Sequence, residues 1–269
     1  MRIHALSTLC ILLFSSTLPA AAQEADAPTG PVYVVTTHQC DWSQLDTVVQ
    51  HHQERMLRLG QALADEGTVR SIGAGVHTWG DDRNYITWVS APDLQTVLAG
   101  TDQLNARYAE AHPSDDVVLA ACPRHQDNFY QGQVLTQPRA ASEEMASREA
   151  ASEATSAAGP PVIAVSYFSC DYRAMDTLIA WERDRMLPIA QDLVDDGSLM
   201  SREVYTHLWG DEWNYVVTRA ARNLPTLLEA NDREVERYEE TYDEAANTMF
   251  GEHCTNHKDN IYTITMATE

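Results

Sequence analysis

A nine-residue pattern rich in chemically active side chains occurs twice in the chain. It reads HTWGDDRNY from His77 and HLWGDEWNY from His207. An imidazole titrates near neutral pH, so the two histidines are candidate catalytic groups, acting as proton carriers or ligand contacts. If each pattern begins on a strand, period-2 alternation places the histidine on the same face as Trp79 or Trp209. The pattern therefore predicts a pocket in which a tryptophan wall flanks a histidine.

The remaining residues of the two patterns fit two interpretations. In the structural one, Gly80 and Gly210 occupy turn conformations, while the acidic and amide side chains hydrogen-bond the local backbone. The structural role is the more common one for such residues. The alternative hypothesis is that they form a ligand site. The candidate ligand-binding residues of the patterns are Trp79, Asp81, Asn84, Tyr85, Trp209, Asp211, Asn214 and Tyr215.

Two arginines form a second pair of candidates. Arg55 and Arg185 each flank the apolar face of a predicted helix, beside Met56 and Met186. Such an arginine can extend to solvent or pair with an acid of its own helix. It can also act as an anion clamp that reaches a ligand carboxylate inside the cavity between helix and sheet. Both alternatives remain open, and both arginines are candidate ligand-binding residues.

Composition excludes several classes of protein. The chain has 269 residues, with Lys+Arg 18 against Asp+Glu 40, and a formal net charge of −22. Such a charge repels phosphate backbones, so no nucleic-acid partner is expected. The sequence contains no nucleophile elbow, phosphate loop, zinc-type cysteine spacing or dinucleotide fingerprint. We therefore predict no metal site and, from the motifs, no cofactor.

The first 22 residues have the organisation of a secretory signal peptide. Arg2 provides a basic start, residues 5–18 form an apolar run, and small residues precede a cleavage site near Ala22. This run is too short for a permanent anchor, and no later stretch reaches the roughly 20 apolar residues of a membrane span. The mature, acidic chain is therefore predicted to be soluble and exported, either periplasmic or secreted.

Four cysteines remain after the predicted cleavage. In an exported protein an even number of thiols tends to pair, and sequence alone allows three pairings. The four residues are Cys40, Cys122, Cys170 and Cys254.

The chain is an internal duplication. Residues 77–85 return 130 positions later, and the same offset relates Cys40 to Cys170 and most of the first half to the second. We predict a first repeat at 31–136, an Ala/Ser/Glu-rich linker at 137–160 and a second repeat at 161–267.

Within each repeat the predicted order of elements is βαββαβ. In the first repeat the predicted strands are 32–39, 68–79, 84–90 and 128–135, and the predicted helices are 41–66, capped by Asp41, and 92–108. This is the order of the ferredoxin-like split βαβ, an α+β fold with the strands arranged 4, 1, 3, 2 and the helices on one face.

The topology has two consequences. The first strand is apolar on both faces, so a second layer must cover the face that the helices leave free, and the other repeat can supply it. Strands 1 and 4 are antiparallel neighbours, so Cys40 can meet Cys122, and Cys170 can meet Cys254. We therefore predict two ferredoxin-like repeats packed as a barrel within one chain, with one disulfide in each.

With these features the chain resembles the dimeric α+β barrel superfamily, in a tandem form. The superfamily includes antibiotic-biosynthesis-monooxygenase-like proteins and two-repeat haem proteins related to chlorite dismutase. The resemblance implies a ligand in the cavity between sheet and helices. It also implies either oxidation without a cofactor or haem bound through a histidine. The surroundings of His77 and His207 match no haem motif, so haem is the minority alternative.

Three functions follow as hypotheses. The first is an exported protein that binds a small, partly apolar molecule in the cavity between sheet and helices. The second is a cofactor-independent or haem-dependent monooxygenase, or an isomerase, with His77 or His207 as base. The third is a structural or assembly role in the cell envelope. Gly73 and Gly75 stand where the second repeat has Glu203 and Tyr205, so we expect more room in the first repeat. The two repeats form a pseudo-dimer, and further homo-oligomerisation stays open.

Overall fold

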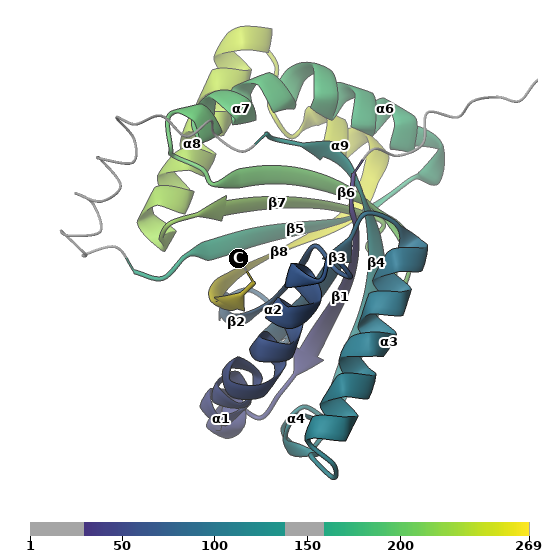
Figure 1. The fold of residues 1–269 in the computed structure, drawn as a ribbon. Coiled ribbons are helices and arrows are strands. Elements are labelled where there is room, and N and C mark those ends of the chain that lie inside the picture. Colours follow the sequence, from purple (N-terminus) through teal and green to yellow (C-terminus); the bar gives the residue numbers. More distant parts are fainter. Residues whose placement is uncertain (1–29, 138–158, 269) are drawn as a thin grey trace, which may run out of the picture.

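The computed structural model describes residues 30–137 and 159–268. The predicted signal peptide, its cleavage site near Ala22 and most of the predicted linker lie outside these residues. In Figure 1 the first repeat runs from purple to teal, and its elements are β1 Val32–Gln39, α1 Leu45–His51, α2 Leu57–Asp65, β2 Ser71–Trp79, β3 Tyr85–Ala91, α3 Leu94–Ala111, α4 Val117–Ala121 and β4 Arg124–Leu135.

The second repeat has the same order of elements. They are β5 Val162–Cys170, α6 Met175–Trp181, α7 Leu187–Asp195, β6 Ser201–Trp209, β7 Tyr215–Ala221, α8 Leu224–Tyr242, α9 Thr248–His253 and β8 Cys254–Ala267.

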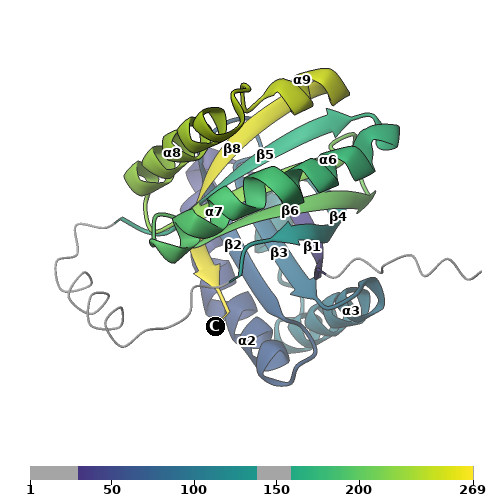
Figure 2. The ribbon, with the colours of Figure 1, turned by 90° about the horizontal axis from the view of Figure 1, so that it is seen from above.

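The eight strands close into one antiparallel barrel with the order β1-β3-β2-β8-β5-β7-β6-β4. Within the first repeat this order is β4-β1-β3-β2, as predicted. The two four-stranded sheets join through β2 with β8 and through β4 with β6. Figures 1 and 2 show the helices of each repeat on the outer side of their own sheet. The predicted α+β fold and pseudo-dimeric barrel are confirmed.

Both faces of β1 are covered by other parts of the protein, as predicted from its apolar residues. Val32 and Val34 pack into the core under the helices. Tyr33 and Val35 pack against a cluster that includes Val165 and Tyr205 of the other repeat. The interior of the barrel is therefore a core that both repeats build.

The first helix of each repeat contains a π-helical segment that periodicity did not predict. A 3-10 turn follows the capping residue Asp41, whose carboxylate accepts a hydrogen bond from the Ser43 backbone N–H. The π segments are His52–Met56 between α1 and α2 and Glu182–Met186 between α6 and α7. A π segment inserts one extra residue into a helix, which rotates the residues that follow and is frequent at functional sites.

The first repeat differs from the prediction most at α4 and at the start of β4, and the ends of β2, β3 and α3 shift by smaller amounts. The short helix α4 was not predicted, although its apolar run VVLAA fits a helical turn packed against α1. β4 begins at Arg124 instead of 128, because HQDN pairs with the end of β1 despite its polar composition. Cross-strand pairing here outweighs residue propensity.

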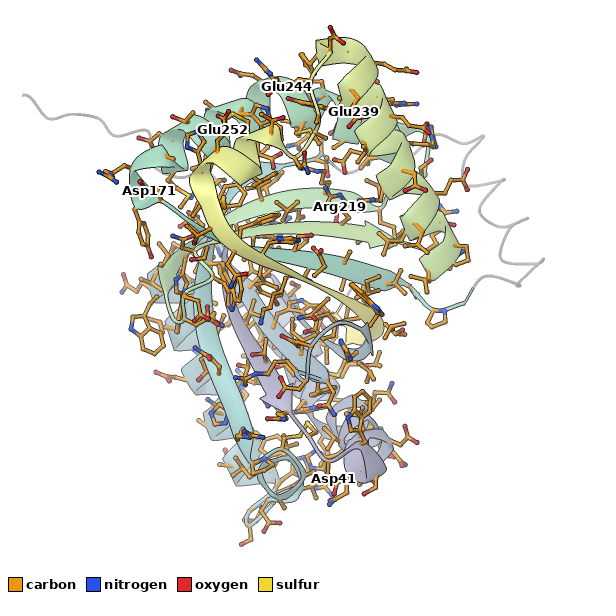
Figure 3. The ribbon with its side chains drawn as sticks, turned by 180° about the vertical axis from the view of Figure 1, so that it is seen from behind. Asp41, Asp171, Arg219, Glu239, Glu244 and Glu252 are labelled. Carbon is orange, nitrogen blue, oxygen red and sulfur yellow. A yellow bond between two sulfur atoms is a disulfide. The ribbon has the colours of Figure 1, made fainter. Side chains whose placement is uncertain are left out.

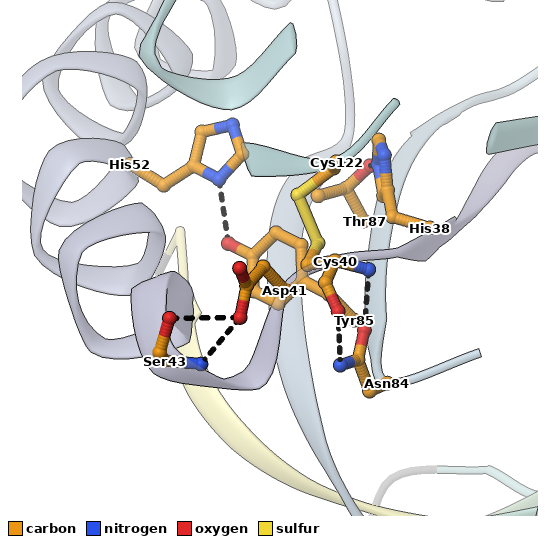
Figure 4. Close-up of a disulfide and its surroundings, with 9 residues drawn as sticks. All are labelled: His38, Cys40, Asp41, Ser43, His52, Asn84, Tyr85, Thr87 and Cys122. Atoms are coloured by element: carbon orange, nitrogen blue, oxygen red, sulfur yellow. Dashed lines mark hydrogen bonds between the residues drawn. A yellow bond between two sulfur atoms is a disulfide. The ribbon is translucent and has the colours of Figure 1, made fainter. Parts of the chain in front are cut away.

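Both predicted disulfides are present. Cys40 bonds Cys122, and Cys170 bonds Cys254. Beside the first bond, the Asn84 side chain accepts from the Cys40 backbone N–H at 2.8 Å and donates to its carbonyl at 2.8 Å (Figure 4). Asn214 does the same for Cys170. The disulfides indicate an oxidising, extracytoplasmic location.

The space expected at Gly73 is filled. The indole of Trp88 lies so close that a Cβ on Gly73 would stand 2.0 Å from it. The expectation of an open first repeat is therefore wrong at this position, because a neighbouring strand supplies the missing volume.

None of the described helices is both long and apolar enough to cross a bilayer.

Candidate functional site

The structure separates the histidines and tryptophans of the repeated pattern. His77 and His207 face the barrel interior, at the ends of β2 and β6 that lead into the hairpins. The ring centroid of His77 lies 5.7 Å from that of Tyr262, and the ring centroid of His207 lies 5.4 Å from that of Tyr130. Burial lowers the pKa of both imidazoles. Trp79 and Trp209 are 61% and 66% exposed. The tryptophans therefore point to solvent and do not wall a pocket around the histidines.

The acidic residues of the pattern join the two repeats. The backbone N–H of Asp81 donates to Asn260 Oδ1 at 2.8 Å, and the backbone N–H of Asp211 donates to Asn128 Oδ1 at 2.9 Å. Each asparagine belongs to the other repeat. Gly80, with φ of 137°, packs so closely that a Cβ would stand 1.8 Å from Asn260 Oδ1. These contacts favour the structural interpretation of the hairpins.

Replacing Asn260 with alanine is expected to lower the free energy of unfolding by about 1–3 kcal/mol, because the Asp81 N–H loses its buried acceptor. Urea unfolding followed by circular dichroism measures the change. Asn256→Ala on the same strand is the control, because Asn256 is exposed. Equal stability of the two variants would show that the asparagine does not hold the repeats together.

Both candidate arginines are engaged in ion pairs outside the cavities described below. Arg55 pairs with Asp115, which also accepts hydrogen bonds from Tyr108 at 2.7 Å and His51 at 2.8 Å. Arg185 pairs with Glu244 at 2.7 Å. The acids lie after the long helices α3 and α8 and not on the arginines' own helix. The arginines therefore tie the first helix of each repeat to the segment after the second.

Two tyrosines of the patterns adjoin cavities. Tyr215 packs with its ring centroid 6.3 Å from that of Phe168 and 5.8 Å from that of Phe250 in the second repeat, and Tyr85 lies at the equivalent place in the first repeat. It is fully buried, its hydroxyl lies 2.6 Å from His52 Nδ1, and the two rings stack at 5.3 Å (Figure 4). Burial lowers the pKa of His52 to about 3 and raises the pKa of Tyr85. Both groups are thus neutral at neutral pH, so Tyr85 donates to Nδ1 and the hydrogen of His52 sits on Nε2.

A cavity of about 340 Å³ lies between the helices and sheet of the first repeat. Three histidines line it together with Met56, Leu104 and Phe129, and they are His38, His52 and His125. The His38 ring lies 6.0 Å from that of His125, and burial, with the charges of His125 and Arg83, lowers the pKa of His38 to about 4. The cavity wall thus combines apolar side chains with the uncharged imidazoles of His38 and His52.

The second repeat has a cavity of about 410 Å³ in the equivalent place, with a different lining. Phe168 replaces His38 and stacks on Phe250 at 4.3 Å, and Glu182 replaces His52. Only His257, the counterpart of His125, is retained. The two cavities therefore suit different chemistry.

A buried ion network adjoins the second cavity. Arg202 pairs with Glu182 at 2.8 Å and with Glu234 at 2.5 Å, and Arg219 pairs with Glu234 at 2.5 Å. Arg202, Glu182 and Glu234 are at most 2% exposed. Figure 3 shows Arg219 on the second sheet, with Glu239 and Glu244 in the helical layer outside it. In the first repeat these positions hold His52, Ile72, Val89 and Leu104.

The spacing of His52 in the sequence indicates that its side chain is buried. Adjacent helix positions point in different directions, and His51 indeed points to Asp115 while His52 points to Tyr85. His52 follows Val48 by four residues, so it continues the apolar stripe that faces the sheet. That spacing predicts a buried imidazole. The proximity of His38 to His125, by contrast, follows only from the pairing of β1 with β4.

Among the described residues, no group of three or more His, Cys, Asp and Glu side chains is placed to hold a metal ion.

Comparisons with known proteins support the fold. No protein-family model matches the chain, and no curated protein matches it. A proposed monooxygenase from Lactobacillus acidophilus NCFM matches with a TM-score of 0.59 and 8% identity, over 89% of this chain and 96% of that one. A proposed monooxygenase from Fusobacterium nucleatum matches at 0.60 and 7%, over 90% and 95%.

An anthrone oxidase-like protein matches with a TM-score of 0.52 and 10% identity, over 89% of this chain and 92% of that one. At such identities the likeness concerns the fold and not the residues of a site. This chain therefore has the fold of the dimeric α+β barrel proteins, in a form where two ferredoxin-like repeats complete one barrel.

Proposed function

We propose that the protein is exported and binds a small, partly apolar molecule in the cavity between helices and sheet of the first repeat. The observation that carries this proposal is the set of imidazoles of His38, His52 and His125 on the wall of an apolar cavity of about 340 Å³. Ligand pockets combine an apolar lining with a few polar groups that orient the ligand, and their volumes are about 300 Å³ or more.

The protonation states indicate the kind of ligand. His52 Nε2 carries a hydrogen and can donate to an oxygen, and neutral His38 can accept or donate. The uncharged imidazoles of His38 and His52 give no ion pair to a carboxylate, and a chain with net charge −22 disfavours anions generally. The best-fitting ligand is an uncharged ring compound with a hydroxyl or carbonyl group.

Export rests on separate support. The apolar segment of residues 5–18 follows a basic start, and both disulfides indicate an oxidising compartment. Comparison of the N-terminal sequence of the protein recovered from the culture medium or periplasm with residues 23 onward tests this part.

We expect His38→Phe to weaken binding of 1-naphthol about tenfold, because a phenyl ring keeps the packing and removes the hydrogen bond. The matched control is His257→Phe, which makes the same change in the cavity of the second repeat. Isothermal titration calorimetry measures both affinities. If His257→Phe alone weakens binding, the ligand lies in the second repeat. If wild type does not bind, a structural role in the envelope gains support.

A second candidate function is oxidation of the bound molecule by O₂ without a cofactor. It is supported by the oxidative names of the three similar structures and by the unprotonated imidazole of His38 on the cavity wall. With its pKa lowered to about 4, this imidazole is a weak base that can take a proton only from a strongly activated C–H or O–H. In this proposal His38 takes the role of base that the sequence suggested for His77 or His207. Oxygen uptake with anthrone as probe, compared between wild type and His38→Phe, distinguishes binding alone from turnover.

A further inference from the structure

A third cavity, of about 230 Å³, lies inside the barrel between the two sheets. Strands of both repeats line it, on the face opposite the helices. Its aliphatic wall includes Ile86, Val165 and Val216, and its aromatic and polar lining includes Tyr33, Trp88, Tyr130, Tyr167, Glu203 and Tyr205. An engineered cavity of about 150 Å³ accommodates benzene, so this interior has the volume for a one-ring molecule with a short side chain.

Glu203 places a carboxyl group in this apolar interior. It accepts a hydrogen bond from the hydroxyl of Tyr205, whose ring packs edge-on against Tyr33 at 5.0 Å. Burial raises the pKa of Glu203, and the positive charge of Arg70 only partly opposes this effect. No ion pair among the described residues includes Glu203. A buried carboxylate is stable when a cation lies beside it, so this site favours a positively charged occupant.

Two tyrosine hydroxyls of the same lining also have open hydrogen-bonding capacity. The hydroxyl groups of Tyr130 and Tyr167 are buried and have no partner among the described residues. Both side chains are 3% exposed. Buried hydroxyl groups are nearly always hydrogen-bonded in folded proteins, so each of these two hydroxyls needs a polar group or a water beside it.

The aromatic lining itself attracts cations. Outside the lining, the ammonium group of Lys258, which pairs with Asp81 at 2.8 Å, lies 5.0 Å from the ring centroid of Tyr167 and 4.9 Å from that of Trp213. Aromatic rings around a cavity recognise ammonium groups through the negative charge on their faces. The net charge of −22 further raises the local concentration of cations.

The two repeats contribute different side chains to this lining. Glu203 and Tyr205 correspond to Gly73 and Gly75, so the carboxyl comes from the second repeat alone. The indole of Trp88 packs over Gly73 and thereby lines the same cavity. Glu203 as a whole residue is half-buried, and it lines the cavity.

We propose that the interior of the barrel binds a small organic ammonium ion with an apolar body, with Glu203 as its counter-charge. The site lies on the opposite face of the first sheet from the proposed site of the first repeat, and Trp88 lines both cavities. The matched probes are 2-phenylethylamine, which is charged at neutral pH, and the uncharged 2-phenylethanol of nearly the same shape.

We expect wild type to bind 2-phenylethylamine at least tenfold more tightly than 2-phenylethanol. Glu203→Gln keeps the shape and an acceptor for Tyr205, and it should weaken amine binding at least tenfold while changing alcohol binding less than twofold. Glu229→Gln is the control, because it makes the same change at an exposed position of α8 outside the cavities. Calorimetry gives the affinities.

A cavity-filling variant locates the ligand independently of charge. Ala220→Leu places a larger side chain in the same interior and should abolish binding of both probes. Wild type that binds neither probe, or amine binding that Glu203→Gln leaves unchanged, overturns the proposal. Binding of 1-naphthol in the first repeat should be unaffected by Glu203→Gln, so failure of one proposal is distinguishable from failure of the other.

Discussion

Replacement of Glu234 by leucine is expected to lower the free energy of unfolding by about 3–5 kcal/mol. Glu234 pairs with both Arg202 and Arg219, and it is 1% exposed. Burial alone would raise the pKa of Glu234, but the two guanidinium charges outweigh it and lower that pKa. The substitution leaves Arg202 with Glu182 alone in a water-poor interior, and Arg219 with no counter-ion in this network. Urea unfolding at neutral pH measures the loss.

The first repeat supplies the control for this experiment. At the four network positions it carries His52, Ile72, Val89 and Leu104, and the last three pack in its hydrophobic core. We expect the combined variant Glu182→His, Arg202→Ile, Arg219→Val and Glu234→Leu to recover stability to the wild-type level, or to exceed it by about 1–4 kcal/mol. A combined variant as unstable as Glu234→Leu would show that the network, and not the unpaired charge, stabilises this repeat.

Loss of the first disulfide is the second large effect. Replacing both Cys40 and Cys122 with serine opens a loop closed over a separation of 82 residues. The chain-entropy relation gives a loss of roughly 4.5 kcal/mol, at the upper end of the measured range for native disulfides. Both sulfurs are also buried in a hydrophobic cluster, so the serine hydroxyls add a desolvation cost. The thermal midpoint and urea midpoint should both fall.

The equivalent double substitution of Cys170 and Cys254 provides a matched comparison, because its loop spans 84 residues. The two variants should lose similar stability if loop closure dominates. Retention of the wild-type midpoints in either variant would contradict a stabilising role for that bond. Reduction of the wild-type protein should reproduce the combined loss, with an intact mass about 4 Da higher once both bonds are open.

The repeated residues and the site residues are mostly different sets, although His125 of the site recurs as His257. Asn84, Asp81 and the cysteines recur in both repeats, and in the structure they close hairpins, join the repeats and bond the strand ends. His38 and His52 do not recur, and they line a cavity. Two copies of one fold must share the contacts that hold it, whereas each copy can change its cavity separately. Residues shared by the two copies are therefore mainly structural.

The sequence alone determined the duplication, the βαββαβ order, the strand arrangement and the disulfide pairing, because each follows from local periodicity and from short-range rules of connection. Only the tertiary structure decided which side chains meet inside. His38 meets His125 through strand pairing, Tyr85 meets His52 across helix and sheet, and Glu203 meets the aromatic lining through closure of the barrel. Such contacts join positions far apart in the chain, so the spacing of residues along one segment does not predict them.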